Sequence, residues 1–290
     1  MNRRLRITDV QPLLAFLLAE LGLKRSAIKQ LLKFGAVWVN GRPVRQFDHP
    51  LVSGDEVTVG TLQTAAVAGR LERARIQLVY EDSALVAVDK PAGLLTVATG
   101  HESTDTLYVR LNEYLSGRNA GHRAHVVHRI DRETSGLVLF AKNESVKRLL
   151  QAGWAKVEKR YYAVVIGHPG AEQGTISNYL TEDRQSLQVL ASDQPLPHSR
   201  LAVSHFRLLK TFGMLSLIEV RLETGRKHQV RVHLAGIGCP VVGDRRYGNR
   251  SVAGRRLALH AGELRLAHPL TGEQLNFRSR LPNSLRRLMS

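Results

Sequence analysis

The sequence predicts an α+β protein with two unequal domains, and three observations lead to this prediction. The first 60 residues contain two short amphipathic helices followed by a small hairpin. From residue 76 onward, short apolar strands mix with occasional helices, without the regular strand–helix–strand spacing of a parallel sheet. Residues 63–75 show no clear periodicity and are typical of a linker. We therefore expect domains at 1–62 and 76–290, the larger one with a mixed or largely antiparallel sheet.

Charge dominates the composition. The 290 residues include 42 Lys and Arg against 25 Asp and Glu, a formal net charge of +17. Such an excess suits a polyanion, either nucleic acid or an acidic membrane surface. No apolar run reaches the roughly 18 residues that a membrane span needs. The basic N-terminus lacks a signal-peptide cleavage site, and the single cysteine, Cys239, rules out an intrachain disulfide. We expect a cytoplasmic monomer that does not contact membranes.

The first predicted domain begins with two helices. Leucines recur at helical spacing over residues 13–21, behind Pro12 and before Gly22. Ser26 is the expected cap of a second helix that ends at Gly35. One face of this helix is apolar, and the other carries Lys24, Arg25, Lys29 and Lys33. A hairpin with a tight turn at Asn40-Gly41 follows.

The second predicted domain is rich in strands. Short apolar runs predict strands at 77–80, 85–88, 94–97, 137–141, 159–167 and 215–223. Helical patterns predict helices at 106–115 and 142–155, and a further helix that begins near residues 224–226.

A charged stretch at residues 128–136 precedes the buried strand at 137–141. At its centre Asp131 lies between Arg129 and Arg132. A rigid strand that presents a polar loop is a common setting for catalysis. Taken alone, however, the stretch fits better with a solvated loop whose charges pair with one another.

Motifs elsewhere in the chain change that interpretation. The stretch 128–137, together with Lys-Arg-Tyr-Tyr-Ala at 159–163 and Thr-Gly-Arg-Lys-His-Gln-Val-Arg-Val-His-Leu at 224–234, resembles the signature motifs of RluA-type RNA pseudouridine synthases. Supporting matches lie at 89–93, 240–244 and 259–261. Together they extend in order over nearly all of residues 76–283. The first domain resembles an S4-type RNA-binding module through residues 24–26, 35–41 and 54–57.

The resemblance implies that the protein isomerises uridine to pseudouridine in RNA without a cofactor. By carry-over, Asp131 is the catalytic carboxylate and Arg226 its partner. Tyr161 is the ring beneath the target base, and Arg129 matches the arginine that enters the space left by the extruded base. In the S4-like domain, the RNA-binding residues are Lys24, Arg25, Lys29 and Lys33.

These roles are chemically consistent. Asp131 can attack the sugar as a nucleophile, or take the C2′ proton to give a glycal-like intermediate, and both routes remain open. A neighbouring guanidinium favours the ionised carboxylate and can bind it bidentately. A stacked base cannot react, so it must be flipped out of the helix, which costs a few kcal/mol.

Several alternatives remain at this stage. The S4-like module favours large-subunit ribosomal RNA over transfer RNA as the substrate, by analogy alone. A non-catalytic RNA- or ribosome-binding protein would be expected to lack Asp131 or its arginine partner. An RNA glycosidase would need a second carboxylate, for which Glu133 is the near candidate. We expect no metal site at the histidines, since no acidic cluster accompanies them. These are His122, His125, His128, His228 and His233.

Overall fold

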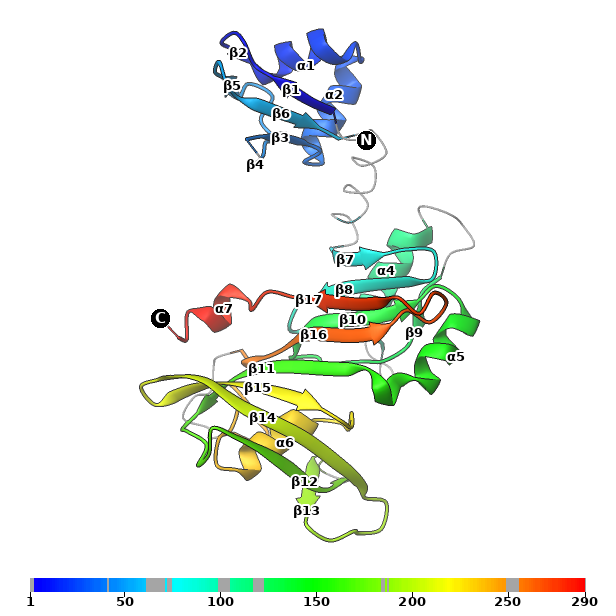
Figure 1. Cartoon of the computed structure of the whole chain (residues 1–290), viewed down its shortest axis with the longest axis vertical. Helices are drawn as coiled ribbons and strands as arrows, with labels where there is room; N and C mark the ends of the chain where they lie inside the picture. The colour runs from blue at the N-terminus through cyan, green and yellow to red at the C-terminus, as the bar shows by residue number, and fades with distance from the viewer. Residues whose placement is uncertain are drawn as a thin grey trace. The chain divides into compact units, whose positions relative to one another are not determined.

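The computed structural model describes residues 3–40, 42–60, 71, 75–98, 105–116, 123–183, 186, 188–248 and 256–289. The chain divides into two compact units, Met1–Arg75 and Ile76–Ser290, each with its own core (Figure 1). The second unit begins at residue 76, where the sequence predicts the start of the larger domain. No helix among the described residues is long and apolar enough to span a bilayer.

The first unit packs two helices against a small antiparallel sheet. Helices α1 (Leu13–Leu21) and α2 (Arg25–Lys33) share a core with the sheet strands. The strand order is β1-β6-β3-β4, and a separate short pair joins β2 to β5. These strands are β1 (Arg3–Arg6), β2 (Gln11–Pro12), β3 (Val37–Val39), β4 (Arg42–Pro43), β5 (Pro50–Leu51) and β6 (Glu56–Val59).

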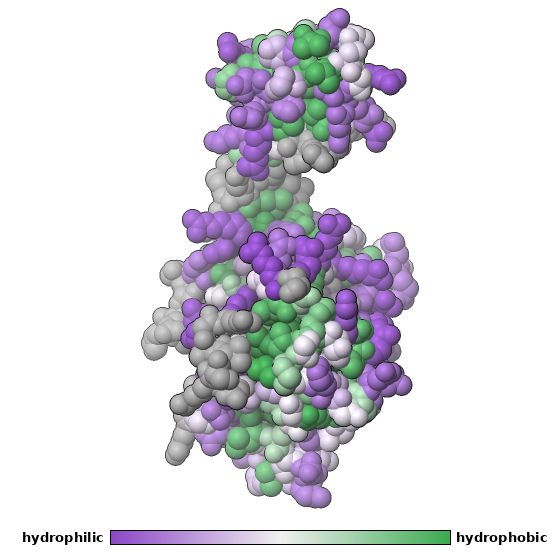
Figure 2. All heavy atoms as spheres, turned by 90° about the vertical axis from the view of Figure 1, so that its left-hand side faces the viewer, coloured by the Kyte–Doolittle hydropathy of each residue, from purple (hydrophilic) through white to green (hydrophobic). Residues whose placement is uncertain are grey.

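Helix α2 separates apolar and basic side chains on opposite faces. Ile28, Leu31 and Leu32 are buried, whereas the four predicted RNA-binding residues Lys24, Arg25, Lys29 and Lys33 are all exposed. Hydrophilic side chains cover much of the face of this unit seen in Figure 2. The predicted Ser26 cap is wrong: the helix begins at Arg25, and the N-cap position is occupied by Lys24 without a side-chain hydrogen bond.

The second unit is built on one large sheet with the strand order β13-β12-β14-β15-β11-β16-β10-β8-β7, to which β9 and β17 add at β10 and β16. The β10–β16 pair is parallel and the other described pairs are antiparallel, so the sheet is mixed and mostly antiparallel, as predicted. The strands are β7 (Gln77–Glu81), β8 (Leu85–Lys90), β9 (His125–Val126), β10 (Ser135–Ala141), β11 (Glu158–Ile166), β12 (Gln173–Glu182), β13 (Val189–Ser192), β14 (Arg200–Phe212), β15 (Leu215–Leu222), β16 (Leu259–Ala267) and β17 (Gln274–Arg278).

Helices lie against this sheet. Helix α5 packs on β9 and β10, and α6 packs on β13 and β14 (Figure 1). The helices are α4 (Leu107–Ser116), α5 (Glu144–Ala152), the short 3₁₀ helix η1 (Trp154–Lys156), α6 (Gln229–Gly236) and α7 (Asn283–Arg286). The predicted strand at 94–97 is wrong, since the segment contributes only an isolated bridge between Leu95 and Thr106.

The start of β10 is fixed by a close backbone approach. All seven residues of β10 are buried. Gly136 has a φ of +114°, and a Cβ atom there would overlap the carbonyl group of Ala261 in β16. Only glycine combines this conformation with this approach at low cost. The parallel pairing therefore fixes the position of the charged loop that immediately precedes β10.

Strand β16 carries a bulge beside the predicted site residue Tyr161 of β11. The register of the two strands shifts between Arg160 and Tyr161, where Gly262 is the extra residue on β16. Such bulges bend a strand and change the direction of its side chains, and they are frequent beside active sites. The bulge therefore lies directly beside Tyr161.

Candidate active site

A buried lysine, Lys90, holds the Asp131 loop in place. The Lys90 side chain is completely inaccessible to solvent, and its Nζ donates to the carbonyl oxygens of Pro91 (3.0 Å), Leu94 (2.7 Å) and Arg132 (3.0 Å). An ammonium group has three donors, and all three are used here. Burial lowers the pKa of Lys90 to about 7, while the nearby charges of Asp131 and Glu133 oppose this shift.

Backbone and hydroxyl contacts complete the attachment of the loop. The N–H of Gly93 donates to the carbonyl of Arg132 at 2.8 Å, and Arg132 Nε returns a bond to the carbonyl of Gly93 at 3.1 Å. The hydroxyl of Thr96 donates to the carbonyl of Ile130 at 3.0 Å. The residues on both sides of Asp131 are thus tied to the turn that follows β8.

His128 fixes the beginning of the same loop. Its Nε2 accepts a hydrogen bond from the N–H of Leu139 in β10 at 2.9 Å, and its ring stacks on Trp154 with the centroids 4.5 Å apart. Burial, together with the charge of Lys159, lowers the pKa of His128 to about 3. The ring is therefore neutral at physiological pH, as an acceptor at Nε2 must be.

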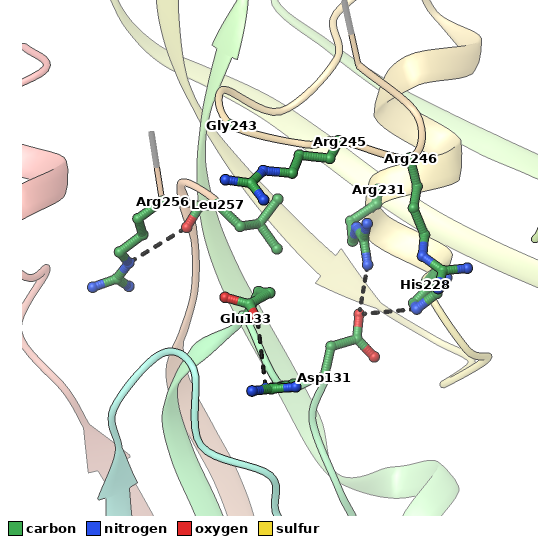
Figure 3. A pocket seen from close by; sticks show the side chains of 10 residues that line it. Asp131, Glu133, His228, Arg231, Gly243, Arg245, Arg246, Arg256 and Leu257 are labelled. Atoms are coloured by element: carbon green, nitrogen blue, oxygen red, sulfur yellow. Dashed lines mark hydrogen bonds and ion pairs between the residues drawn. The ribbon is translucent and has the colours of Figure 1, made fainter. Parts of the chain in front are cut away.

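Asp131 faces two basic side chains from one end of α6 (Figure 3). Its Oδ2 lies 3.5 Å from Arg231 Nη1 and 3.9 Å from His228 Nε2. The Asp131 side chain is 29% exposed, so it remains open to a ligand, whereas those of Arg231 (9%) and His228 (10%) are nearly buried.

A second carboxylate holds Arg231 in place. Asp244 accepts from Arg231 Nε at 2.7 Å and from Nη2 at 2.8 Å, a bidentate pair whose carboxylate is fully buried. Burial would raise the pKa of Asp244, but its bonds to Arg231 outweigh this and lower it. The ring of Tyr247 lies 5.1 Å from the guanidinium carbon. Only Nη1 of Arg231 remains directed at Asp131.

This arrangement corrects the predicted partner of Asp131. Arg226 Nε donates to the carbonyl oxygen of Leu201 at 3.0 Å, and no ion pair joins Arg226 to Asp131. The reason is local: the Gln229 side chain accepts from the N–H of Arg226 at 3.0 Å, in the turn before α6 begins. Arg231, within the first turn of α6, takes the position that the sequence assigned to Arg226.

His228 has a strained backbone, and its neighbours determine which ring nitrogen carries the proton. It is a non-glycine residue in the left-handed region, with a φ of 54°, a conformation that often accompanies functional sites. Its Nδ1 lies 2.8 Å from the hydroxyl of Tyr247. Burial lowers the pKa of His228 to about 4, with the charge of Asp131 acting against burial. A neutral ring places its proton on Nε2, toward the acceptor-only Asp131, so Tyr247 donates to Nδ1.

Tyr161 and Arg129 line a pocket of about 320 Å³ that also reaches Asp131, His228 and Arg231. Arg226 lies on its edge as well, so the pocket brings together all four predicted catalytic and substrate-binding residues. The Tyr161 hydroxyl makes no hydrogen bond to any residue that the structure describes. Burial and then the charge of Asp131 raise the pKa of Tyr161. The hydroxyl is therefore protonated at neutral pH and available to a ligand.

A second, larger cavity of about 590 Å³ adjoins Asp131 on another side. Its lining is dominated by arginine (Figure 3). The residues are Asp131, Arg132, Glu133, His228, Arg231, Gly243, Arg245, Arg246, Arg256 and Leu257.

Sequence reasoning missed several residues of this site. Arg231 and His228 lie within the quoted motif at 224–234, so the motif was a usable signal for both. Arg245, Arg246 and Arg256 gave no comparable signal, because only the fold brings them to the Asp131 loop. Lys90 lies in the supporting match at 89–93, but that match does not indicate its contact with Arg132. Within the described residues, no group of three or more His, Cys, Asp or Glu side chains is placed to hold a metal ion.

The buried histidines make the stability of this unit sensitive to mild acid. Burial holds the pKa of His128 at about 3 and those of His228 and His233 at about 4. In the unfolded chain these rings bind protons below about pH 6.5. Unfolding therefore takes up protons, and stability is complete above pH 6.5 and declines as the pH falls toward 4.

We expect each of these histidines to lower the free energy of unfolding by about 1 kcal/mol between pH 7.5 and 5.5. Urea unfolding of a Trp38→Phe variant, followed by Trp154 fluorescence, measures this. His233→Gln should lower the number of protons taken up on unfolding by one, and so reduce the slope of the free energy of unfolding against pH. A free energy that is constant over this range would contradict the prediction, since paired carboxylates titrate at lower pH.

Comparisons with known proteins agree with this geometry. The family model for RNA pseudouridylate synthase matches residues 84–236. The chain is 36% identical over 271 residues to "Uncharacterized RNA pseudouridine synthase YlyB" of Bacillus subtilis (strain 168), covering 91% of this chain and 88% of that one. It is 33% identical over 285 residues to "Ribosomal large subunit pseudouridine synthase D" of Zymomonas mobilis, covering 92% and 88%.

Among solved structures, "Human RNA Pseudouridylate Synthase Domain Containing 4" superimposes with a TM-score of 0.64 at 24% identity, over 77% of this chain and 96% of that one. At this identity the similarity concerns the fold. The family model and the relatives identify the chain: it belongs to the RNA pseudouridylate synthase family and is an isomerase.

Proposed function

We propose that this enzyme converts uridine to pseudouridine in large-subunit ribosomal RNA, as a cytoplasmic monomer, with Asp131 as the catalytic carboxylate. The observation that carries the proposal is the position of Asp131. It lies at the mouth of the Tyr161 pocket, paired with Arg231, on a loop that is fixed on both sides. The relative from Zymomonas mobilis, named for the ribosomal large subunit, supports the choice of RNA.

In this proposal, the pocket of about 320 Å³ receives the flipped uracil against Tyr161. Arg231 and the Nε2–H of His228 orient Asp131 toward the ribose. The carboxylate then acts on C1′ as a nucleophile or on the C2′ proton as a base. Tyr161, held protonated, supports the detached ring by stacking and by donating a hydrogen bond. Exposed Arg129, on the same pocket, fills the space left by the base.

We further propose that residues 1–62 form an S4-like module, followed by a linker at 63–75 and the catalytic domain at 76–290. The exposed basic face of α2, with Lys24, Arg25, Lys29 and Lys33, supports this assignment. The module would add affinity for RNA phosphates without taking part in the chemistry.

Replacing Asp131 with Asn tests the function directly. The side chain keeps its size but loses the charge and the nucleophile, so we expect at least a 10³-fold loss of pseudouridine formation with little change in thermal stability. The measurement is pseudouridine mapping in ribosomal and transfer RNA from cells that carry wild-type protein, Asp131→Asn protein or none. Near wild-type conversion by the variant would refute the catalytic role of Asp131. If cells without the protein lacked a pseudouridine only in transfer RNA, transfer RNA would be the substrate.

Two arginines of one motif give contrasting predictions. Arg231→Gln removes the cation that faces Asp131 and leaves buried Asp244 unpaired, so we expect kcat to fall by 10² or more and stability by about 3 kcal/mol. Arg226→Gln removes a bond to a backbone carbonyl, and we expect a change in kcat below about tenfold. Single-turnover rates and urea unfolding distinguish the two. A larger loss for Arg226→Gln would restore it as the partner of Asp131.

The basic face of α2 is tested by changing Lys24, Arg25, Lys29 and Lys33 to Gln together. We expect weaker binding to ribosomal RNA and a shallower dependence on salt, by roughly 0.7 to 0.9 log units per lost phosphate contact, with kcat unchanged. A matched variant with Arg in place of the three lysines keeps the charge and should bind like wild type. If the neutral variant kept wild-type affinity, these residues would not bind RNA.

A further inference from the structure

The arginine-lined cavity of about 590 Å³ has no part in the chemistry described so far. It shares Asp131, His228 and Arg231 with the Tyr161 pocket, so the two cavities meet at the carboxylate. A nucleotide that places its base against Tyr161 and its ribose at Asp131 has two phosphate groups left to accommodate. The adjoining cavity is where the chain can continue.

The charges of the cavity do not balance internally. Five arginines line it, against the carboxylates of Asp131 and Glu133. Buried Asp244 balances the charge of Arg231, and Glu133 lies 3.8 Å from Arg132. Even without Arg246, the cations Arg245 and Arg256 then face the single carboxylate of Asp131, so the lining keeps an excess of positive charge next to the point at which chemistry occurs.

Arg256 is a partly buried cation whose hydrogen-bond partners are all neutral. It donates to the carbonyl of Leu257 at 3.5 Å, to the hydroxyl of Ser284 at 3.1 Å, and to the hydroxyl of Ser135. No carboxylate of the described residues lies within ion-pair distance of it. Burial lowers the pKa of Arg256, with the charges of Asp89 and Glu133 acting against it. A partly buried guanidinium without a counter-ion is costly unless a ligand supplies one.

Arg245 provides the second cation. It follows Asp244 directly, in the turn whose N–H groups at Arg246 and Tyr247 are held by the Asp244 carboxylate. Its guanidinium extends into the cavity toward Leu257 in Figure 3, and it forms no ion pair within the described part of the chain. Two guanidinium groups are thus available to an anion from different elements.

We propose that this cavity is a phosphate-binding subsite, in which Arg245 and Arg256 hold the phosphodiester groups adjoining the flipped uridine. Guanidinium forks bind phosphate oxygens bidentately, with geometry that an ammonium cannot reproduce. Because Ser135 lies in β10 and Arg256 contacts it, a phosphate at Arg256 is positioned by the strand that directly follows the Asp131 loop. The subsite thus fixes the ribose relative to the carboxylate and offsets part of the cost of flipping.

This inference rests on the proposed function, and its test separates the two. The probe is a fluorescent 12-residue oligouridylate, and the protein is the full chain with Asp131→Asn, which binds without turnover. In this background we expect Arg245→Gln to weaken binding about tenfold at 0.1 M salt and to reduce the salt slope by roughly 0.7. Arg148, 79% exposed on α5 and outside both cavities, provides the control: Arg148→Gln should bind like the parent.

Arg256 also supports the fold, so it needs a paired comparison. Arg256→Lys keeps the charge but not the bidentate geometry, and Arg256→Gln keeps neither, so we expect the lysine variant to recover part of the affinity that the glutamine variant loses. Thermal unfolding of both variants reports the structural contribution separately. With Asp131 intact, Arg245→Gln should raise KM for ribosomal RNA and lower kcat/KM about tenfold.

An Arg245→Gln variant with the parent salt slope and KM would overturn the subsite. Equal affinities for Arg256→Gln and Arg256→Lys would also count against it. If the wild-type enzyme formed no pseudouridine in ribosomal RNA, the proposed substrate would fail. The salt slopes with oligouridylate would still decide whether the cavity binds phosphates.

Discussion

The site depends on a single guanidinium held between two carboxylates. Asp244 takes Nε and Nη2 of Arg231 in a buried bidentate pair, and this leaves Nη1 for Asp131. A lysine has a single nitrogen and cannot bind in both directions with fixed geometry. Because Asp244 also accepts N–H groups from the turn that carries Arg245, one buried acid orders the charges on two sides of the catalytic carboxylate.

Asp131 itself is held by a different kind of interaction. The buried ammonium of Lys90 collects three carbonyl oxygens from the loop and from the turn after β8. These carbonyl groups bind Lys90 and do not compete with Asp131 for Arg231 or His228. The backbone of the loop is therefore rigid while its carboxylate remains partly exposed between two cavities, which suits a group that must meet a large, flexible substrate.

The sequence alone predicts those parts of the molecule that local patterns determine. The helix at 13–21, the buried strand at 137–141, the strand that carries Tyr161 and the mixed sheet all follow from periodicity and turn residues. The Asp131 loop follows from motifs. The partner of Asp131 does not, because the side chain of Gln229, the first residue of α6, binds the N–H of Arg226 in the preceding turn, and the helix that follows brings Arg231 to the carboxylate. The contact of Lys90 with the Asp131 loop joins residues 42 positions apart and is not indicated by local patterns.

The parallel pairing of β10 with β16 has a consequence for the order of events in the cell. Ser135 is hydrogen-bonded to His260 across 125 positions of sequence, so this contact forms only after β16 has left the ribosome. Contacts this distant form late, because the chain between them must first be synthesised and ordered. A nascent chain therefore carries the Asp131 loop without a finished site until β16 has been made. Activity begins only after residues 259–267 have been synthesised and paired with β10.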